Sequence, residues 1–172
     1  MKDVMLDFET FGNGKNAAVC QVGAVFFDRK TGALGKEFFC NIDARSTVKS
    51  GGEIDADTVY WWLDQKQEAR DALKGQQFDI NVVFKDLNEF LGNADAIWSH
   101  ATFDFVILQE TMKRLGIKPK YSYRSARDLR TLNDLAPKDT DAGPFAGTPH
   151  NALDDCRNQI KYCVAALNRI SK

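Results

Sequence analysis

The stretch Asp3-Val4-Met5-Leu6-Asp7-Phe8-Glu9-Thr10 sets two carboxylates two residues apart within an apolar run. Successive residues of a β-strand alternate between the two faces of a sheet, so a strand here would point Asp7 and Glu9 to the same side. Two anions held side by side need a cation, and carboxylate oxygens suit Mg²⁺ or Mn²⁺. We therefore predict a strand over residues 3–9 that carries part of a metal site.

Three more acidic signatures lie far along the chain. They are the pair Phe103-Asp104, Asp128, and His150 followed by Asp155. Two divalent ions a few ångströms apart form the usual clamp for in-line attack on a phosphodiester. Carboxylates in this number and pattern indicate a metal-dependent nuclease.

Composition fits one compact domain over residues 1–172, with 44% hydrophobic and 11% aromatic residues. Acidic residues within the first ten positions exclude a secretory signal, and no apolar stretch approaches the roughly 20 residues of a membrane span. A soluble, cytoplasmic protein is expected. The four cysteines contain no C-x-x-C and are joined by only two histidines, which argues against a structural zinc site.

The charge balance limits the nucleic acid that the protein can hold. A net charge of -1 and a pI near 6.1 are not those of a protein that coats long duplexes, since such affinity scales with the number of phosphates neutralised. A short footprint is expected. Cations gather in one stretch that could steer a strand toward the acidic centre, or could merely solvate a helix end and a loop: Lys113, Arg114, Lys118, Lys120, Arg124, Arg127 and Arg130.

Hydrophobic periodicity predicts an α/β order of elements. Strands are expected at residues 3–9, 19–28, 35–42 and 96–99, with a turn at Thr31-Gly32. Helices are expected after the capping candidates Asp55 or Asp57, Asp79 and Asp128, between Thr102 and Gly116, and over residues 151–169. Residues 137–149, with three prolines and two glycines, are predicted to form a loop.

The motifs together resemble a known family. Asp7-Phe8-Glu9-Thr10, then Gln21-Val22-Gly23-Ala24-Val25, then Phe103-Asp104, then His150-Asn151-Ala152-Leu153-Asp154-Asp155 resemble the exonuclease motifs of the DEDDh 3′-5′ exonucleases. That family includes ribonuclease T, oligoribonuclease and polymerase proofreading subunits. The resemblance spans residues 7–155 and implies an α/β, ribonuclease H-like fold, with a central mixed β-sheet flanked by α-helices.

The resemblance also implies roles for individual residues. Asp7, Glu9, Asp104 and Asp155 would hold two divalent ions, Mg²⁺ or Mn²⁺ in its place, and His150 would act as the general base. Asp154 could face inward instead, but the family spacing favours Asp155. The second motif departs from the commoner form, because Ser99 and His100 stand where histidine and asparagine are usual. Trp98-Ser99-His100, Trp61-Trp62 and Arg127-Asp128-Leu129-Arg130 look more like a small branch of bacterial and phage 3′-5′ exoribonucleases.

Substrate contacts are predicted among aromatic and polar residues near these motifs. Trp61 and Trp62 cannot both face the core of one helix, so one of them is expected to be exposed and to stack on a base. Phe11 is a second candidate, against the 3′-terminal base. Core packing is the alternative for each aromatic, and helix capping or an ion pair is the alternative for Asp128. The predicted contacts are Thr10, Phe11, Trp61, Trp62, His100, Arg127 and Asp128.

Three functions remain distinct at this level. The leading one is an enzyme that removes nucleoside 5′-monophosphates from the free 3′ end of single-stranded RNA. The second keeps the chemistry with single-stranded DNA as substrate, as in proofreading or repair. The third is a catalytically silent binding module, against which all five catalytic positions weigh. Because family members are often homodimers, a homodimer is also expected.

Overall fold

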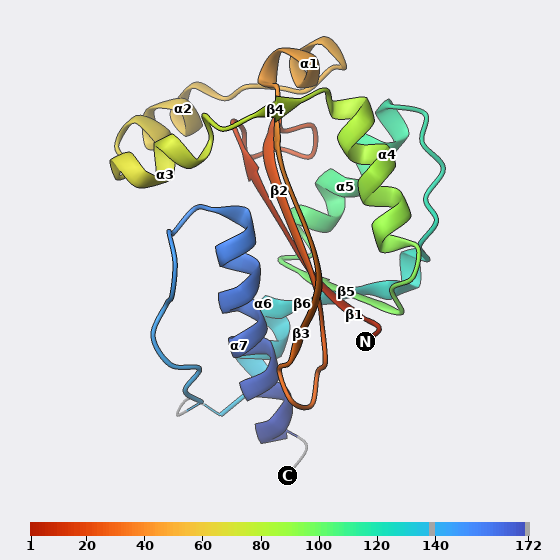
Figure 1. Ribbon diagram of the computed structural model, residues 1–172, viewed down its shortest axis with the longest axis vertical. Helices are drawn as coiled ribbons and strands as arrows, with labels where there is room; N and C mark the ends of the chain where they lie inside the picture. Colours follow the sequence, from red (N-terminus) through yellow and green to blue (C-terminus); the bar gives the residue numbers. More distant parts are fainter. Residues whose placement is uncertain (138–139, 171–172) are drawn as a thin grey trace.

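The computed structural model describes residues 1–137 and 140–170, and its centre is a six-stranded sheet with helices on both faces (Figure 1). The strand order is β4-β3-β2-β1-β5-β6. β1, β2 and β3 pair antiparallel, whereas β5 is parallel to β1, β6 to β5, and β4 to β3. The strands are β1 (Asp3–Thr10), β2 (Val19–Phe27), β3 (Leu34–Ile42), β4 (Gln77–Phe78), β5 (Ala96–Ser99) and β6 (Ala126–Asp128). This mixed sheet confirms the predicted fold class.

The three long strands lie within one residue of their predicted bounds. Every residue of β1 and β2 is buried, as expected for strands covered on both faces. The turn between β2 and β3 forms at Thr31-Gly32 as predicted. Asp28 accepts hydrogen bonds from the backbone N–H groups of Lys30 and Thr31, and Gly32 takes the left-handed conformation with φ 77°.

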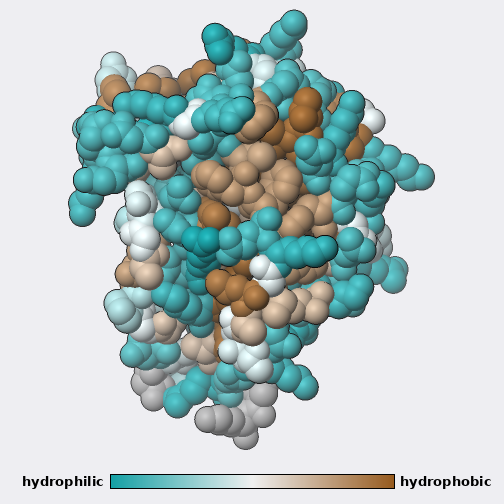
Figure 2. Space-filling view, in the orientation of Figure 1, coloured by the Kyte–Doolittle hydropathy of each residue, from teal (hydrophilic) through white to brown (hydrophobic). Residues whose placement is uncertain are grey.

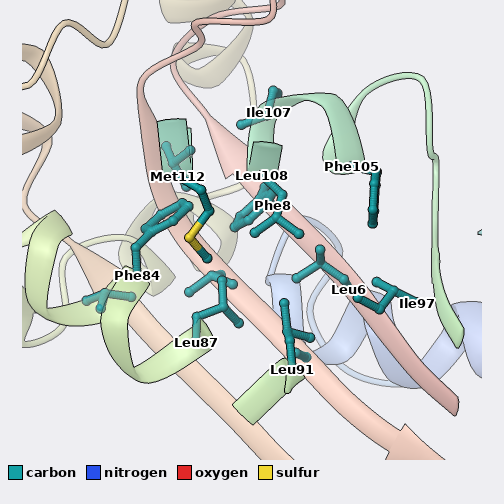
Figure 3. Packing of buried hydrophobic residues seen from close by; sticks show 14 of the residues in the cluster. Leu6, Phe8, Phe84, Leu87, Leu91, Ile97, Phe105, Ile107, Leu108 and Met112 are labelled. Carbon is teal, nitrogen blue, oxygen red and sulfur yellow. The ribbon is translucent and has the colours of Figure 1, made fainter. Parts of the chain in front are cut away.

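Two hydrophobic cores share the sheet. α4 (Ile80–Leu91) and α5 (Asp104–Arg114) cover one face, where Leu6 and Phe8 of β1 meet Phe84, Leu87, Leu108 and Met112 (Figure 3). α6 (Leu129–Leu135) and α7 (Ala152–Ile170) cover the other face, where Met5 and Trp98 meet Leu129, Cys156 and Ile160. Alternate residues of β1 therefore serve opposite cores.

Helix ends follow the predicted caps. Asp55 caps α2 (Ala56–Leu63), Asp79 caps α4 and Asp128 caps α6, each by accepting backbone N–H bonds in the first turn. Gly116 has φ 66° just beyond α5. Five short elements were not expected: the strands β4 and β6, α1 (Ala44–Lys49), α3 (Gln67–Ala72) and the 3₁₀ turn η1 (Tyr123–Ser125).

The predicted loop at 137–149 is without helix or strand where the structure describes it. Residues 138–139 of that loop and residues 171–172 of the predicted domain lie outside the described residues. Within residues 1–137 and 140–170, no helix combines the length and the apolar character needed to span a membrane.

One edge of the sheet is open. β4 pairs only with Asn41 and Ile42, so within residues 1–137 and 140–170 most of β3 has no strand partner on its outer side. Apolar side chains gather in patches near the middle of the face seen in Figure 2, with hydrophilic residues between them, and exposed apolar residues of β3 and β4 include Leu34, Phe39 and Phe78.

Candidate active site

The alternation of side chains along β1 places the carboxylates of Asp7 and Glu9 on one face of the sheet. Leu6 and Phe8 enter the core beneath α4 and α5, so Asp7 and Glu9 point to the opposite face, toward α7. Their side chains are largely buried, with 7% of Asp7 and 9% of Glu9 exposed. Asp7 Oδ1 accepts a hydrogen bond of 2.7 Å from Gln159 Nε2 of α7. The predicted same-face arrangement is confirmed.

A close contact between β2 and α7 brings the last motif to these carboxylates. Gly23 pairs with Asp7 across the strands, and a side chain there would overlap the backbone of Ala152 at the start of α7. The fully buried Gln21 accepts a hydrogen bond of 2.7 Å from the Ala152 N–H and also donates to Asn41. The sequence analysis includes Gln21 and Gly23 in a motif but does not predict that they position the start of α7.

Strand β5 leads to Asp104, another carboxylate of the site. Asp104 begins α5, shortly after β5 has paired with β1, and only 1% of it is exposed. Its Oδ1 accepts a bond of 3.2 Å from the Phe8 N–H, and its Oδ2 accepts one of 3.0 Å from the His100 N–H. These two backbone donors fix the carboxylate beside β1.

The ligand atoms form two adjacent groups. One consists of Asp7, His100 and Asp104, and the other of Glu9, His150 and Asp155, with the ligand atoms of each group within 4.8 Å of one another. All five predicted catalytic residues are thus brought together. His100, predicted only as a substrate contact, also lies at a position where it could bind metal.

The electrostatics of the site fit divalent cations. Burial first, and then the neighbouring carboxylates, raise the pKa of Asp7 and of Glu9 well above the usual range. Burial raises the pKa of Asp104 to about 7 and that of Asp155 to about 6. Crowded, desolvated carboxylates of this kind call for a compensating positive charge, and an oxygen-rich donor set suits Mg²⁺ or Mn²⁺.

Asp155, rather than Asp154, faces this centre. Asp154 turns away, where its carboxylate accepts the Thr148 N–H at 3.0 Å and pairs with Arg157 at 3.1 Å. The choice made from the family spacing is therefore the one that the geometry supports.

His150 is held in an unusual backbone conformation against aromatic rings. Its φ is 62°, which is uncommon for a residue with a side chain. The ring centroids of Trp61 and Trp62 lie 4.8 Å and 6.1 Å from that of His150, both edge to face. Burial lowers the pKa of the imidazole below its ordinary value, which favours the neutral form that can accept a proton.

The two tryptophans differ in exposure as predicted. Trp62 is 4% exposed and donates its indole N–H to the Thr10 carbonyl at 2.8 Å, whereas Trp61 is 43% exposed. Phe11 packs its ring against Trp62, with centroids 6.4 Å apart, and thus supports the buried tryptophan.

A cavity of about 440 Å³ opens beside Glu9. Trp61 and Phe103 supply aromatic walls, while Asn13, Asp57 and Thr58 supply polar groups. Thr10 also borders it, but Phe11 does not. Phe103 was not predicted as a wall, although its place next to Asp104 in the second motif was a usable signal.

Two arginines of the predicted basic stretch, Arg127 and Arg130, lie in different surroundings. The Arg127 guanidinium donates to the carbonyls of Arg124 and Ala126, both at 2.8 Å, and so serves the local backbone. Burial and then the positive charge of Arg130 lower the pKa of His100, and Arg130 also opposes in small part the rise that burial causes in the pKa of Asp104. No hydrogen bond engages its guanidinium in the described part of the chain, and its charge acts on the carboxylates of Asp104 and Asp128.

Asp128 connects the start of α6 to the loop that precedes Asp104. One carboxylate oxygen accepts the Ala101 N–H at 2.9 Å, and the other accepts the Thr131 N–H at 2.9 Å. The capping role that was the alternative for Asp128 is thus observed, and the cap ties α6 to the loop that precedes Asp104.

Comparison with known proteins identifies the family of the chain. The sequence model of the Rv2179c-like 3′-5′ exoribonuclease domain matches residues 2–167. The chain belongs to this family. A relative of this family member is the exodeoxyribonuclease of Enterobacteria phage T4, with 25% identity over 97% of this chain and 89% of the phage protein.

Solved structures share the fold of this Rv2179c-like domain. E. coli exonuclease I in complex with a dA16 oligonucleotide superposes with a TM-score of 0.65 at 16% identity over 97% of this chain. The zinc-bound complex of the same E. coli enzyme with single-stranded DNA gives 0.63, also at 16% identity, over 98% of this chain. The domain spans only 41% and 40% of those two chains. The predicted ribonuclease H-like nuclease fold is confirmed, and the chain is a 3′-5′ exonuclease by family.

Proposed function

We propose that this protein uses two divalent ions to hydrolyse single-stranded RNA from its 3′ end, releasing nucleoside 5′-monophosphates. The observation that carries the proposal is the convergence of Asp7, Glu9, Asp104 and Asp155 in two adjacent ligand groups, with His150 at one of them. Carboxylates from β1, α5 and α7 have no structural reason to be buried together without a cation.

The residues of the site have different roles in the proposed hydrolysis. Bound at these two groups, divalent ions would lower the pKa of the attacking water and stabilise the charge on the departing 3′ oxygen. His150 accepts the proton of that water, and its depressed pKa keeps it neutral at physiological pH. Gln159 holds Asp7 in place by its 2.7 Å hydrogen bond. Arg130 is positioned to bind a backbone phosphate on the Asp104 side of the centre.

The cavity beside Glu9 supports action at an end. Trp61 and Phe103 can stack against the terminal base, while the polar side chains face the sugar. A duplex interior would have to unpair before a base could enter, at a cost of a few kcal/mol. A frayed or single-stranded 3′ terminus is therefore the substrate form that fits.

RNA is favoured because the family is described as exoribonucleases. DNA is the second candidate, because a relative aligned over most of both chains is an exodeoxyribonuclease. Asn13 and Asp57 in the cavity are able to form a hydrogen bond with a ribose 2′-OH. The test is the kcat/KM for matched RNA and DNA oligomers of one sequence. A higher value for RNA supports the proposal, and a higher value for DNA replaces it with the second candidate.

A homodimer and a cytoplasmic location stay predictions. The open edge of β3, with its apolar neighbours, is the place where a second copy could extend the sheet. Sedimentation of the purified protein measures the oligomeric state directly.

A further inference from the structure

Trp61 takes part in two arrangements at once. Its ring stands edge to face against His150 with centroids 4.8 Å apart, and the same residue forms a wall of the cavity beside Glu9. Phe103, a second aromatic wall, makes no ring contact with His150 among the described residues. One side chain therefore touches both the candidate base and the space proposed for the terminal nucleoside.

His150 depends on these rings for its orientation. It follows an exposed loop, and its backbone, held at a positive φ and hydrogen-bonded to the Asp155 carboxylate, does not fix the direction of the ring. Where the structure is described, its imidazole contacts Trp61 and Trp62 and makes no hydrogen bond. A general base must be held close to the proton that it removes, and small misplacements lower the rate strongly.

The two tryptophans are not equally fixed. Trp62 is buried and bound by its indole N–H to the carbonyl of Thr10, directly after Glu9. Trp61 is 43% exposed, and it packs against Trp62 with ring centroids 5.1 Å apart. No hydrogen bond of the Trp61 indole occurs in the described residues, so ring packing against Trp62 and His150 holds it on one side and the cavity leaves it open on another.

We infer that Trp61 is a positioning residue that senses the base of the 3′-terminal nucleotide. A base stacked on Trp61 fixes the indole, and the fixed indole holds the His150 imidazole at the attacking water. The inference rests on the proposed function, because it needs His150 as the base and the cavity as the terminal nucleoside site. It predicts that an end without a base is cleaved slowly even when the strand is fully bound.

The test is a cycle of two enzymes and two substrates at saturating enzyme, with the single-turnover rate constant as the readout. Wild type and Trp61→Ala are each given an oligonucleotide with an ordinary 3′ end and one whose 3′-terminal residue lacks a base. In wild type, removal of the base should slow cleavage about 10-fold, as expected for an aromatic contact that orients the base catalyst. In Trp61→Ala, which is already slow, removal of the base should change the rate less than about 2-fold.

Phe103→Ala is the matched control. It removes the other wall of the cavity but leaves the Trp61 contact with His150, so the effect of base removal on the rate constant should persist. Trp61→Phe keeps an aromatic ring at the position and should restore most of the rate and of the base effect. This variant also guards against misfolding as the cause of a slow Trp61→Ala.

Equal slowing by base removal in wild type and in Trp61→Ala would overturn the inference. His150→Ala separates this failure from a failure of the proposed function. If His150→Ala cleaves slowly while the two effects add independently, the base assignment stands and only the sensing role of Trp61 is wrong. If His150→Ala cleaves at the wild-type rate, the proposed mechanism itself fails.

Discussion

Replacing Asp104 by asparagine should stabilise the metal-free protein above neutral pH. Burial raises the pKa of Asp104 from its ordinary 3.8 to about 7, so the folded state binds its proton more tightly than the unfolded state does. This contribution to stability is fully present below the unfolded pKa and is lost as the pH rises through about 7. A pKa difference of about 3 corresponds to about 4 kcal/mol. Asparagine is neutral at every pH and escapes this loss.

The free energy of unfolding of wild type and Asp104→Asn should be measured by urea denaturation in EDTA at several pH values. At about pH 4 the variant should be the less stable of the two, because its amide NH2 cannot accept one of the two backbone N–H bonds that the carboxylate accepts. Between about pH 4 and about pH 8 the stability of the variant relative to wild type should rise by up to about 4 kcal/mol. Adding Mg²⁺ at about pH 8 should stabilise wild type more than the variant. Asp154→Asn is the control, because its carboxylate pairs with Arg157 outside the centre. A difference between wild type and Asp104→Asn that does not change with pH would refute the reasoning.

Three further outcomes are expected. His150→Ala should lower the cleavage rate by roughly 10² to 10⁴-fold, while calorimetry should show that metal binding is retained. His100→Ala should slow cleavage much less, and the reverse order of the two effects would make His100 the base. Arg130→Ala should weaken binding of a single strand and should reduce, by about 0.7, the slope of the logarithm of the binding constant against the logarithm of the salt concentration. Arg127→Ala should change neither quantity, because its guanidinium is bound to backbone carbonyls. A 3′-phosphate should block digestion and a 5′ block should not, while nicking of a circular single strand would reveal an endonuclease.

Much of this architecture could be predicted from local patterns. β1 shows both an apolar run and the spacing of Asp7 and Glu9, so its strand character and its polar face follow from alternation. Asp55, Asp79 and Asp128 stand where side-chain oxygens cap helices, and the structure uses all three. The elements α1, α3 and β4 could not be predicted, because each has six or fewer residues and so short a segment shows too little periodicity to be distinguished from a loop.

The parts of the site that could not be predicted depend on long-range geometry. Gln159 reaches Asp7 from the middle of α7, and nothing in its local sequence marks it. The contact of Trp61 with His150 joins residues far apart in the chain and needs the positive φ of His150. Arg127 and Arg130 both stand in the predicted basic stretch, and a sequence does not give the direction of either side chain.

The most direct test of the two-metal assignment is digestion of a 5′-labelled single-stranded oligonucleotide with Mg²⁺ by wild type and by Asp7→Ala, followed on a sequencing gel. Wild type should shorten the strand one nucleotide at a time from the 3′ end and release nucleoside 5′-monophosphates, and EDTA should stop it. Asp7→Ala, although folded, should leave the strand intact, because Asp7 lies beside Glu9, Asp104 and Asp155 at the centre of the site. Retention of more than about a few per cent of wild-type activity by Asp7→Ala would contradict the account.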